Sequence, residues 1–163
     1  GNRYLRAAPS NIYPTKDGRW MAIGGNGQGI FRRLSAAMGQ PQLADDPRFE
    51  SNLARVEHAA DLDEVISAWT RTRDSDEVSA ILVAASVPAG PVMSVADIAA
   101  DPHFQARGMI AQVPDEKGAR ITMPGIVPKF RTHAAQLTMA AGAVGRDAAQ
   151  IMRELGLTME VSS

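Results

Sequence analysis

Four glycines gather in the run Gly24-Gly25-Asn26-Gly27-Gln28-Gly29. Between a strand and a helix, the backbone N–H groups of such a loop can bind a phosphate. Asp45 and Asp46 follow at about the distance at which a dinucleotide-binding fold places its ribose-binding acid. The glycine spacing does not fit G-x-G-x-x-G, and no Gly-Lys-Ser/Thr of a P-loop occurs. The pattern favours a sharp strand-to-helix turn, and leaves open a loop that approaches a ligand bound mainly by another domain.

The other residues that could carry chemistry are scattered. His58, His103 and His133 do not share the spacing of metal ligands, and no G-x-S-x-G elbow places a serine beside a base. The chain contains no cysteine, which excludes disulfides, thiolate metal sites and cysteine nucleophiles. We therefore expect no metal site and no catalytic nucleophile in this chain.

Composition indicates an ordinary globular chain. It has 163 residues, of which 45% are hydrophobic and 21% charged, and its formal net charge is −1. The length suits one domain, and the charge balance argues against nucleic acid or an anionic membrane surface as a partner. No apolar run approaches the ~18 residues of a membrane span. These features predict a cytoplasmic protein, and the first residue, Gly1 rather than Met, favours a fragment of a longer one.

The first half of the chain predicts a hairpin followed by helices. Asp17-Gly18 separates two short apolar runs, so strands are expected at 11–15 and 19–24. A helix should follow the glycine run and end at Gly39, because its apolar residues recur at helical spacing. Asp46 before Pro47 predicts another helix start, since proline suits the first helical position. The apolar residues of the first of these helices are Ile30, Leu34, Ala37 and Met38.

The second half predicts helices, then a second hairpin and a final helix. Two helices with apolar stripes are expected in the middle, the second with Ser75 as its N-cap, before Pro88 and Pro91 break the helix. Short helices are predicted at 95–100 and from Asp101, and a second hairpin at 109–113 and 119–123. A final helix from residue 144 carries a stripe of three apolar side chains, Ile151, Met152 and Leu155. The fold class is therefore α+β, with a small antiparallel sheet from two hairpins that bracket a helical middle.

Several collinear segments resemble one known family across nearly the whole chain. They are residues 13–20 (YPTKDGRW), the DPRF motif at 46–49 with Asn52 and Arg55-Val56, VPAGP at 87–91, DPHFQARGM at 101–109, MPG at 123–125 and RELG at 153–156. In this order they resemble the C-terminal part of the class III (CaiB/BaiF-like) CoA-transferases. This family includes formyl-CoA transferase, carnitine–CoA transferase and α-methylacyl-CoA racemase.

The resemblance implies a small domain at 1–131, a connecting arm at 132–143 and a C-terminal helix at 144–163. That helix would pack on a large domain that precedes residue 1. In the family an Asp of the large domain attacks the acyl-CoA thioester, so no catalytic residue is expected here and the fragment alone should be inactive. The substrates would be a coenzyme A thioester and a carboxylic acid acceptor, with no tightly bound cofactor. The whole protein would be an interlocked homodimer.

The resemblance also assigns a role to the glycine run. Gly25, Asn26, Gly27 and Gln28 would form part of the acyl-site wall, with the two amides able to hydrogen-bond a substrate, although a turn that merely contains amides remains an alternative. Racemases of the family carry a Glu at or beside position 27, and this chain has none, which favours a transferase over a racemase. A gating loop of formyl-CoA transferases corresponds to residues 6–10, which lack its glycines. A stand-alone binding module without chemistry is the third possibility.

Overall fold

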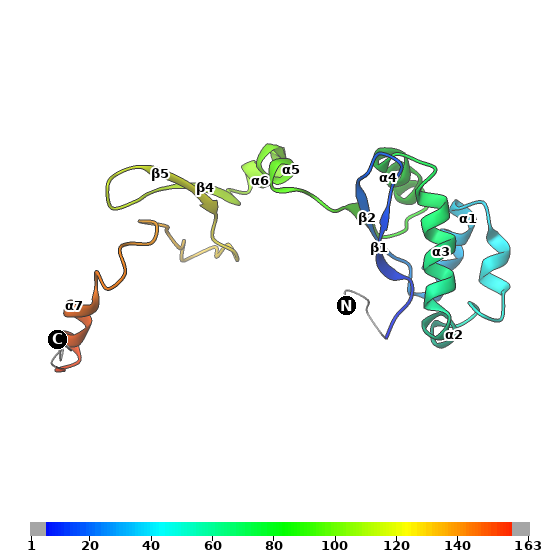
Figure 1. The fold of residues 1–163 in the computed structure, drawn as a ribbon, viewed down its shortest axis with the longest axis horizontal. Helices are drawn as coiled ribbons and strands as arrows, with labels where there is room; N and C mark the ends of the chain where they lie inside the picture. The colour runs from blue at the N-terminus through cyan, green and yellow to red at the C-terminus, as the bar shows by residue number, and fades with distance from the viewer. Residues whose placement is uncertain (1–5, 158–163) are drawn as a thin grey trace. The chain divides into compact units, whose positions relative to one another are not determined.

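The computed structural model describes residues 6–157 and divides the chain into two compact units, Gly1–Met93 and Ser94–Ser163 (Figure 1). We call them unit 1 and unit 2. The fold class is α+β, as predicted, and each predicted hairpin forms a sheet of its own. None of the described helices is long and apolar enough to cross a membrane. The domain limits expected at 131/132 and 143/144 remain predictions.

Unit 1 contains β1 (Ser10–Pro14), β2 (Trp20–Gly24), α1 (Gln28–Ala37), the 3₁₀ helix η1 (Pro41–Asp45), α2 (Asn52–Glu57), α3 (Ala59–Thr70), α4 (Ser75–Ala84) and β3 (Ala89–Pro91).

The sheet of unit 1 is antiparallel, in the order β1-β2-β3. The predicted hairpin is confirmed, with each strand within a residue of its expected limits. The third strand was not expected, because its three residues, Ala89–Pro91, include a proline and show no alternation. It pairs with β2 so that Ala22 lies opposite both Ile12 and Gly90.

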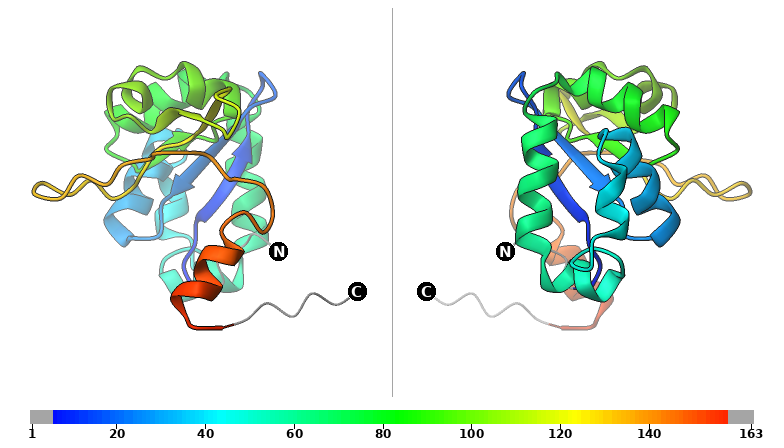
Figure 2. Two further views of the ribbon diagram at one scale, coloured as in Figure 1. Left: turned by 90° about the vertical axis from the view of Figure 1, so that its left-hand side faces the viewer. Right: turned by 90° about the vertical axis from the view of Figure 1, so that its right-hand side faces the viewer.

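The core of unit 1 lies between one face of this sheet and the helices. Strand residues such as Tyr13 and Met21 are fully buried against Leu34 of α1 and Leu62 of α3. Helix α3 runs alongside β1 in both views of Figure 2. Because side chains alternate along a strand, the opposite face carries Ile12, Trp20 and Ala22, which are exposed.

Two predicted caps are corrected by the structure. The helix expected from Asp46 is absent, because the Asp46 carboxylate accepts hydrogen bonds from Arg48 in a single turn. Helix α2 begins later, after Ser51, whose hydroxyl accepts from the backbone N–H of Ala54 at 3.1 Å. Ser75 is the first residue of α4 rather than its N-cap, which is Asp74.

Unit 2 holds the second hairpin between short helices. The helices at 95–100 and after Asp101 and the hairpin are confirmed. The alternation of Ile121 and Met123 with Arg120 and Thr122 is typical of a strand with one buried face, but Ile121 is exposed. The final helix begins at Ala148 rather than at residue 144. Residues 132–143 form no helix or strand. The elements are α5 (Val95–Ala100), α6 (Pro102–Ala106), β4 (Ile110–Pro114), β5 (Arg120–Pro124) and α7 (Ala148–Glu154).

Candidate functional site

The glycine run forms the connection from β2 to α1, and its shape depends on close packing at Gly25. The backbone N–H of Gly25 donates to the carbonyl of Pro9 at 2.8 Å. A Cβ atom at this position would lie 2.8 Å from Leu34 Cδ2 and 2.9 Å from Pro9 Cγ, closer than carbon atoms pack. Only glycine fits here without displacing its neighbours, so the loop is pressed onto the core at this residue.

The two amide side chains of the run lie on the surface and take part in hydrogen bonds. Asn26 Nδ2 donates to Ser10 Oγ at 3.1 Å, which ties the loop to the start of β1. Gln28 Oε1 accepts from Arg55 Nη1 at 2.9 Å. The carbonyl of Gly27 accepts the first backbone hydrogen bond of α1, from Phe31. Of the four predicted site residues, Asn26 and Gln28 thus present polar side chains, while Gly25 and Gly27 shape the backbone.

Arg55 of α2 lies beneath this loop and is completely buried. Besides Gln28, its guanidinium donates to the carbonyls of Ala8, Asn26 and Phe49, each at 2.8 Å. Within residues 6–157 no carboxylate pairs with it. Burial lowers the pKa of Arg55, but the group remains charged at neutral pH. The loop therefore rests on a buried positive charge that only neutral oxygens surround.

Asn52, one turn before Arg55, fixes the segment that precedes β1. Its Oδ1 accepts from the backbone N–H of Ala8 at 3.2 Å, and its Nδ2 donates to the carbonyl of Arg6 at 3.1 Å. Arg55 holds the carbonyl of the same Ala8. Two side chains of α2 thus bind the segment to which the family resemblance assigned a gating loop.

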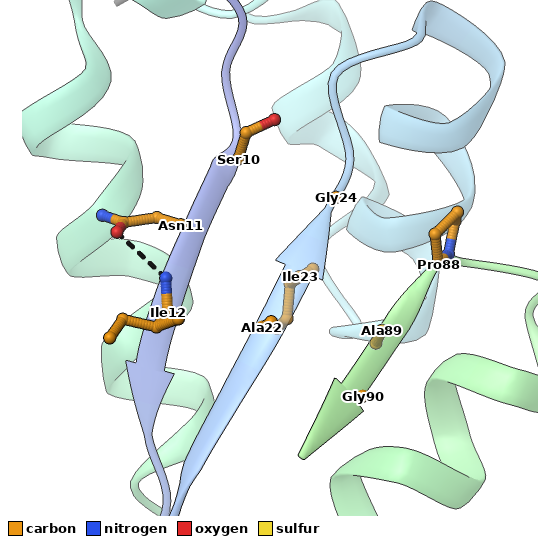
Figure 3. Close-up of a pocket in the computed structure, with 9 residues that line it drawn as sticks. All are labelled: Ser10, Asn11, Ile12, Ala22, Ile23, Gly24, Pro88, Ala89 and Gly90. Carbon is orange, nitrogen blue, oxygen red and sulfur yellow. Dashed lines mark hydrogen bonds between the residues drawn. The ribbon is translucent and has the colours of Figure 1, made fainter. Parts of the chain in front are cut away.

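A shallow hollow of about 520 Å³ opens on the exposed face of the sheet (Figure 3). Its floor is made of small or apolar residues, including Ile12, Ala22 and Gly90. At one end lie Ser10 and Gly24, which pair across the strands, and Ser10 is the hydroxyl bound by Asn26. The hollow thus has an apolar floor and a polar end formed beside the loop.

The remaining candidates take structural positions. The Asp17 carboxylate accepts from the hydroxyls of Thr15 and Ser75, which hold its pKa far below the usual range, and so joins the first hairpin to α4. Asp45 pairs with Arg32 at 3.4 Å on the surface. His58 lies 3.8 Å from Asp61, also at the surface. No group of three metal-ligating side chains occurs in the part of the chain that the structure describes.

Arg55 and Asn52 were not among the residues predicted to form the site. Both stand in the motif that carries the family resemblance, where each is a polar residue within the helical stretch 52–57. An arginine that a fold buries needs hydrogen-bond acceptors, and the sequence does not reveal which distant carbonyls supply them. Their membership of a collinear motif was the available signal.

Comparison with known proteins gives one consistent result. Residues 1–148 match the family model described as CoA-transferase family III. A succinyl-CoA–D-citramalate CoA-transferase of Chloroflexus aurantiacus is 42% identical over 159 residues, which cover 97% of this chain and 40% of the relative. A succinate–glutarate CoA-transferase of Agrobacterium fabrum is 36% identical over 127 residues, which cover 77% of this chain and 31% of the relative.

The solved structures agree with this match. A CAIB/BAIF family protein from Brucella suis has a TM-score of 0.69 and 33% sequence identity, with 95% of this chain and 39% of that chain covered. The protein Rv3272 from Mycobacterium tuberculosis, at 21% identity and a TM-score of 0.70, shares the fold over 89% of this chain. The chain spans about 40% of the length of the succinyl-CoA–D-citramalate CoA-transferase named above.

Proposed function

This chain belongs to CoA-transferase family III, and we propose that it is the C-terminal part of an enzyme that moves coenzyme A between acyl groups. The substrates proposed are succinyl-CoA and a small dicarboxylic acid. The observation that carries this choice is the 42% identity, over 97% of this chain, to a relative named for succinyl-CoA and D-citramalate. The relative at 36% identity is named for succinate and glutarate, which are dicarboxylic acids as well.

The proposed reaction exchanges one thioester for another. The C–S bond of the donor breaks, a new one forms at the acceptor carboxyl carbon, and the donor acyl group leaves as a carboxylate. In the net balance one oxygen atom passes from the acceptor carboxylate to the donor acyl group. No electrons are gained or lost. The nucleophilic Asp that the family resemblance implies lies outside this chain, so we assign catalysis to the whole protein and a binding role to the chain described here.

The loop at Gly25, Asn26, Gly27 and Gln28 is the proposed contact with the acyl group. Asn26 and Gln28 are both exposed, and Asn26 binds Ser10, which lines the polar end of the apolar hollow. A polar end beside an apolar floor suits a short acyl chain with a polar terminus. Both side chains are neutral amides, and neither can remove a proton from carbon. The loop therefore supports transfer between carboxylates rather than racemisation.

Exposed apolar side chains support a further contact with polypeptide beyond this chain. Ile151 of α7 is 51% exposed, and Leu155, which follows the helix, is 65% exposed. On this basis we propose that α7 docks onto another domain of the whole protein. From the family resemblance we further propose an interlocked homodimer in the cytoplasm. Without that domain the exposed side chains should make the chain self-associate, so light scattering that shows a stable monomer at all concentrations would argue against this contact.

An assay of the protein expressed from its whole reading frame tests the proposed function. Succinyl-CoA is supplied as donor with D-citramalate, L-malate or glutarate as acceptor, and the new CoA thioester is measured by chromatography. Transfer to at least one acid is expected, and none from the chain of residues 1–163 alone. Exchange of the α-proton of a chiral 2-methylacyl-CoA without any acceptor would instead indicate a racemase. Turnover by the isolated chain would refute the assignment of catalysis to the missing part.

A further inference from the structure

Arg55 determines which way the amide of Gln28 faces. A guanidinium only donates hydrogen bonds, so the atom 2.9 Å from Arg55 Nη1 must be the carbonyl oxygen of the amide, Oε1. The amide nitrogen Nε2 then faces away from Arg55, and Gln28 is an exposed residue. Within residues 6–157 it donates to no protein group. Two N–H donors are therefore available at the loop surface in a fixed orientation.

Arg55 is itself held too firmly to follow Gln28 if that side chain turns. Three of its hydrogen bonds are to backbone carbonyls, those of Ala8, Asn26 and Phe49. Its guanidinium also lies over the ring of Phe31, 4.5 Å from the ring centroid. These contacts come from separate segments of unit 1, so the guanidinium has one position, and Gln28 binds to it rather than the reverse.

The charge of Arg55 adds a preference for anions. Among residues 6–157 no acidic side chain neutralises it, and its four acceptors are uncharged. In a low-dielectric interior such a charge acts more strongly on neighbouring groups than in water. A carboxylate on the substrate matches both the donors of Gln28 and the positive charge behind them.

We propose that Arg55 is a positioning residue that presents the side-chain amide of Gln28 as a hydrogen-bond donor to a substrate carboxylate. The proposal rests on the proposed function, because only a substrate in this site makes the donor useful. It goes beyond that function by naming the donor atom, Gln28 Nε2, and the residue that orients it.

The variant Gln28→Glu separates positioning from structure. A glutamate at this position accepts from Arg55 as Oε1 does and gives the buried charge a partner, but it presents a second oxygen where Nε2 stood. In the whole protein with succinyl-CoA and its best acceptor, we expect kcat/KM to fall by about tenfold or more, since a hydrogen bond to a charged group is lost. The melting temperature should not fall. Gln42→Glu makes the same charge change on an exposed residue of η1 and is the matched control. It should leave kcat/KM and the melting temperature unchanged.

A double-mutant cycle tests the role of Arg55 itself. Arg55→Lys keeps the charge but loses the planar guanidinium that orients Gln28. If Arg55 acts through Gln28, then Gln28→Met should lower kcat/KM far less in the Arg55→Lys background than in the wild type. Additive losses would mean that Arg55 has only a structural role. Should Arg55→Lys fail to fold, Gln28→Glu decides alone.

The outcomes distinguish this proposal from the proposed function. A wild-type protein without transfer activity refutes both. An active wild type whose Gln28→Glu variant keeps kcat/KM within about twofold refutes the donor role alone, since losing a charge-assisted hydrogen bond costs more than that.

Discussion

Two glycines four positions apart in the same run should respond oppositely to alanine. In Gly25→Ala the new Cβ would lie 2.8 Å from Leu34 Cδ2 and 2.9 Å from Pro9 Cγ, and Leu34 is fully buried. Overpacking of this kind costs about 1–3 kcal/mol. In Gly29→Ala the Cβ lies 3.7 Å from Arg33 Nη1, an ordinary contact, on the second residue of α1. Replacing a helical glycine by alanine stabilises by about 0.5–1 kcal/mol.

These free energies convert into measurable shifts of the melting temperature. For a unit of this size, about 1 kcal/mol moves the melting temperature by about 4–8 °C. A cost of about 2 kcal/mol therefore lowers it by about 8–16 °C in Gly25→Ala. Gly29→Ala should raise it by about 2–8 °C.

Tryptophan fluorescence is the appropriate assay, because both tryptophans of the chain, Trp20 and Trp69, belong to unit 1. The signal then follows the unit that contains the loop, whatever happens to unit 2. Equal shifts of the same sign in the Gly25→Ala and Gly29→Ala variants would show that the loop is not pressed onto Leu34 and Pro9.

Three further predictions concern caps and charges. Arg55→Met leaves four acceptors without a donor and should destabilise unit 1 by about 3 kcal/mol or more, whereas Arg32→Met at the surface should change the urea midpoint little. Because the pKa of Asp17 is lowered in the folded state, its bonds to Ser75 stabilise above the unfolded pKa of 3.8, and this contribution is lost as the pH falls toward the lower folded value. The urea midpoints of wild type and Asp17→Asn should thus differ at pH 6, and the difference should shrink progressively as the pH falls below 3.8. A difference independent of pH would contradict this. Ser94→Ala removes a capping box and should cost about 1 kcal/mol, read as lower helicity of unit 2 by circular dichroism.

The elements that sequence predicted correctly are those set by local signals. Gly39 adopts a φ of +74° just beyond α1, as a helix-ending glycine does, and Asp17-Gly18 closes the first hairpin. Strand β3 could not be predicted in this way, because its three residues become a strand only through pairing with β2, far away in the chain. The predicted helix start at Asp46 was wrong for a related reason, because the Asp46 carboxylate accepts its hydrogen bonds from Arg48 in a turn rather than capping a helix.

The same division between local and nonlocal signals applies to the candidate site. Its position, between β2 and α1, follows from the glycine run, and the sequence alone located Asn26 and Gln28 there. What orients them is nonlocal: Arg55 lies 27 residues from Gln28 along the chain, and Ser10 lies 16 residues from Asn26. The sequence pattern of α2 did not indicate a buried arginine, because the acceptors that stabilise the buried guanidinium are carbonyls of other segments.

The buried arginine also bears on the choice between transfer and racemisation. A general base for removing an α-proton works best when its pKa lies near the working pH, which for a carboxylate requires burial without a cation. An acid at position 28 would be bound by Arg55, and a neighbouring cation lowers a carboxylate pKa instead of raising it. Arg55 therefore makes position 28 a poor place for a base, yet the same charge strengthens an amide there as a partner for an anion. This supports the proposal that the loop holds a substrate carboxylate, with catalysis assigned to another part of the whole protein.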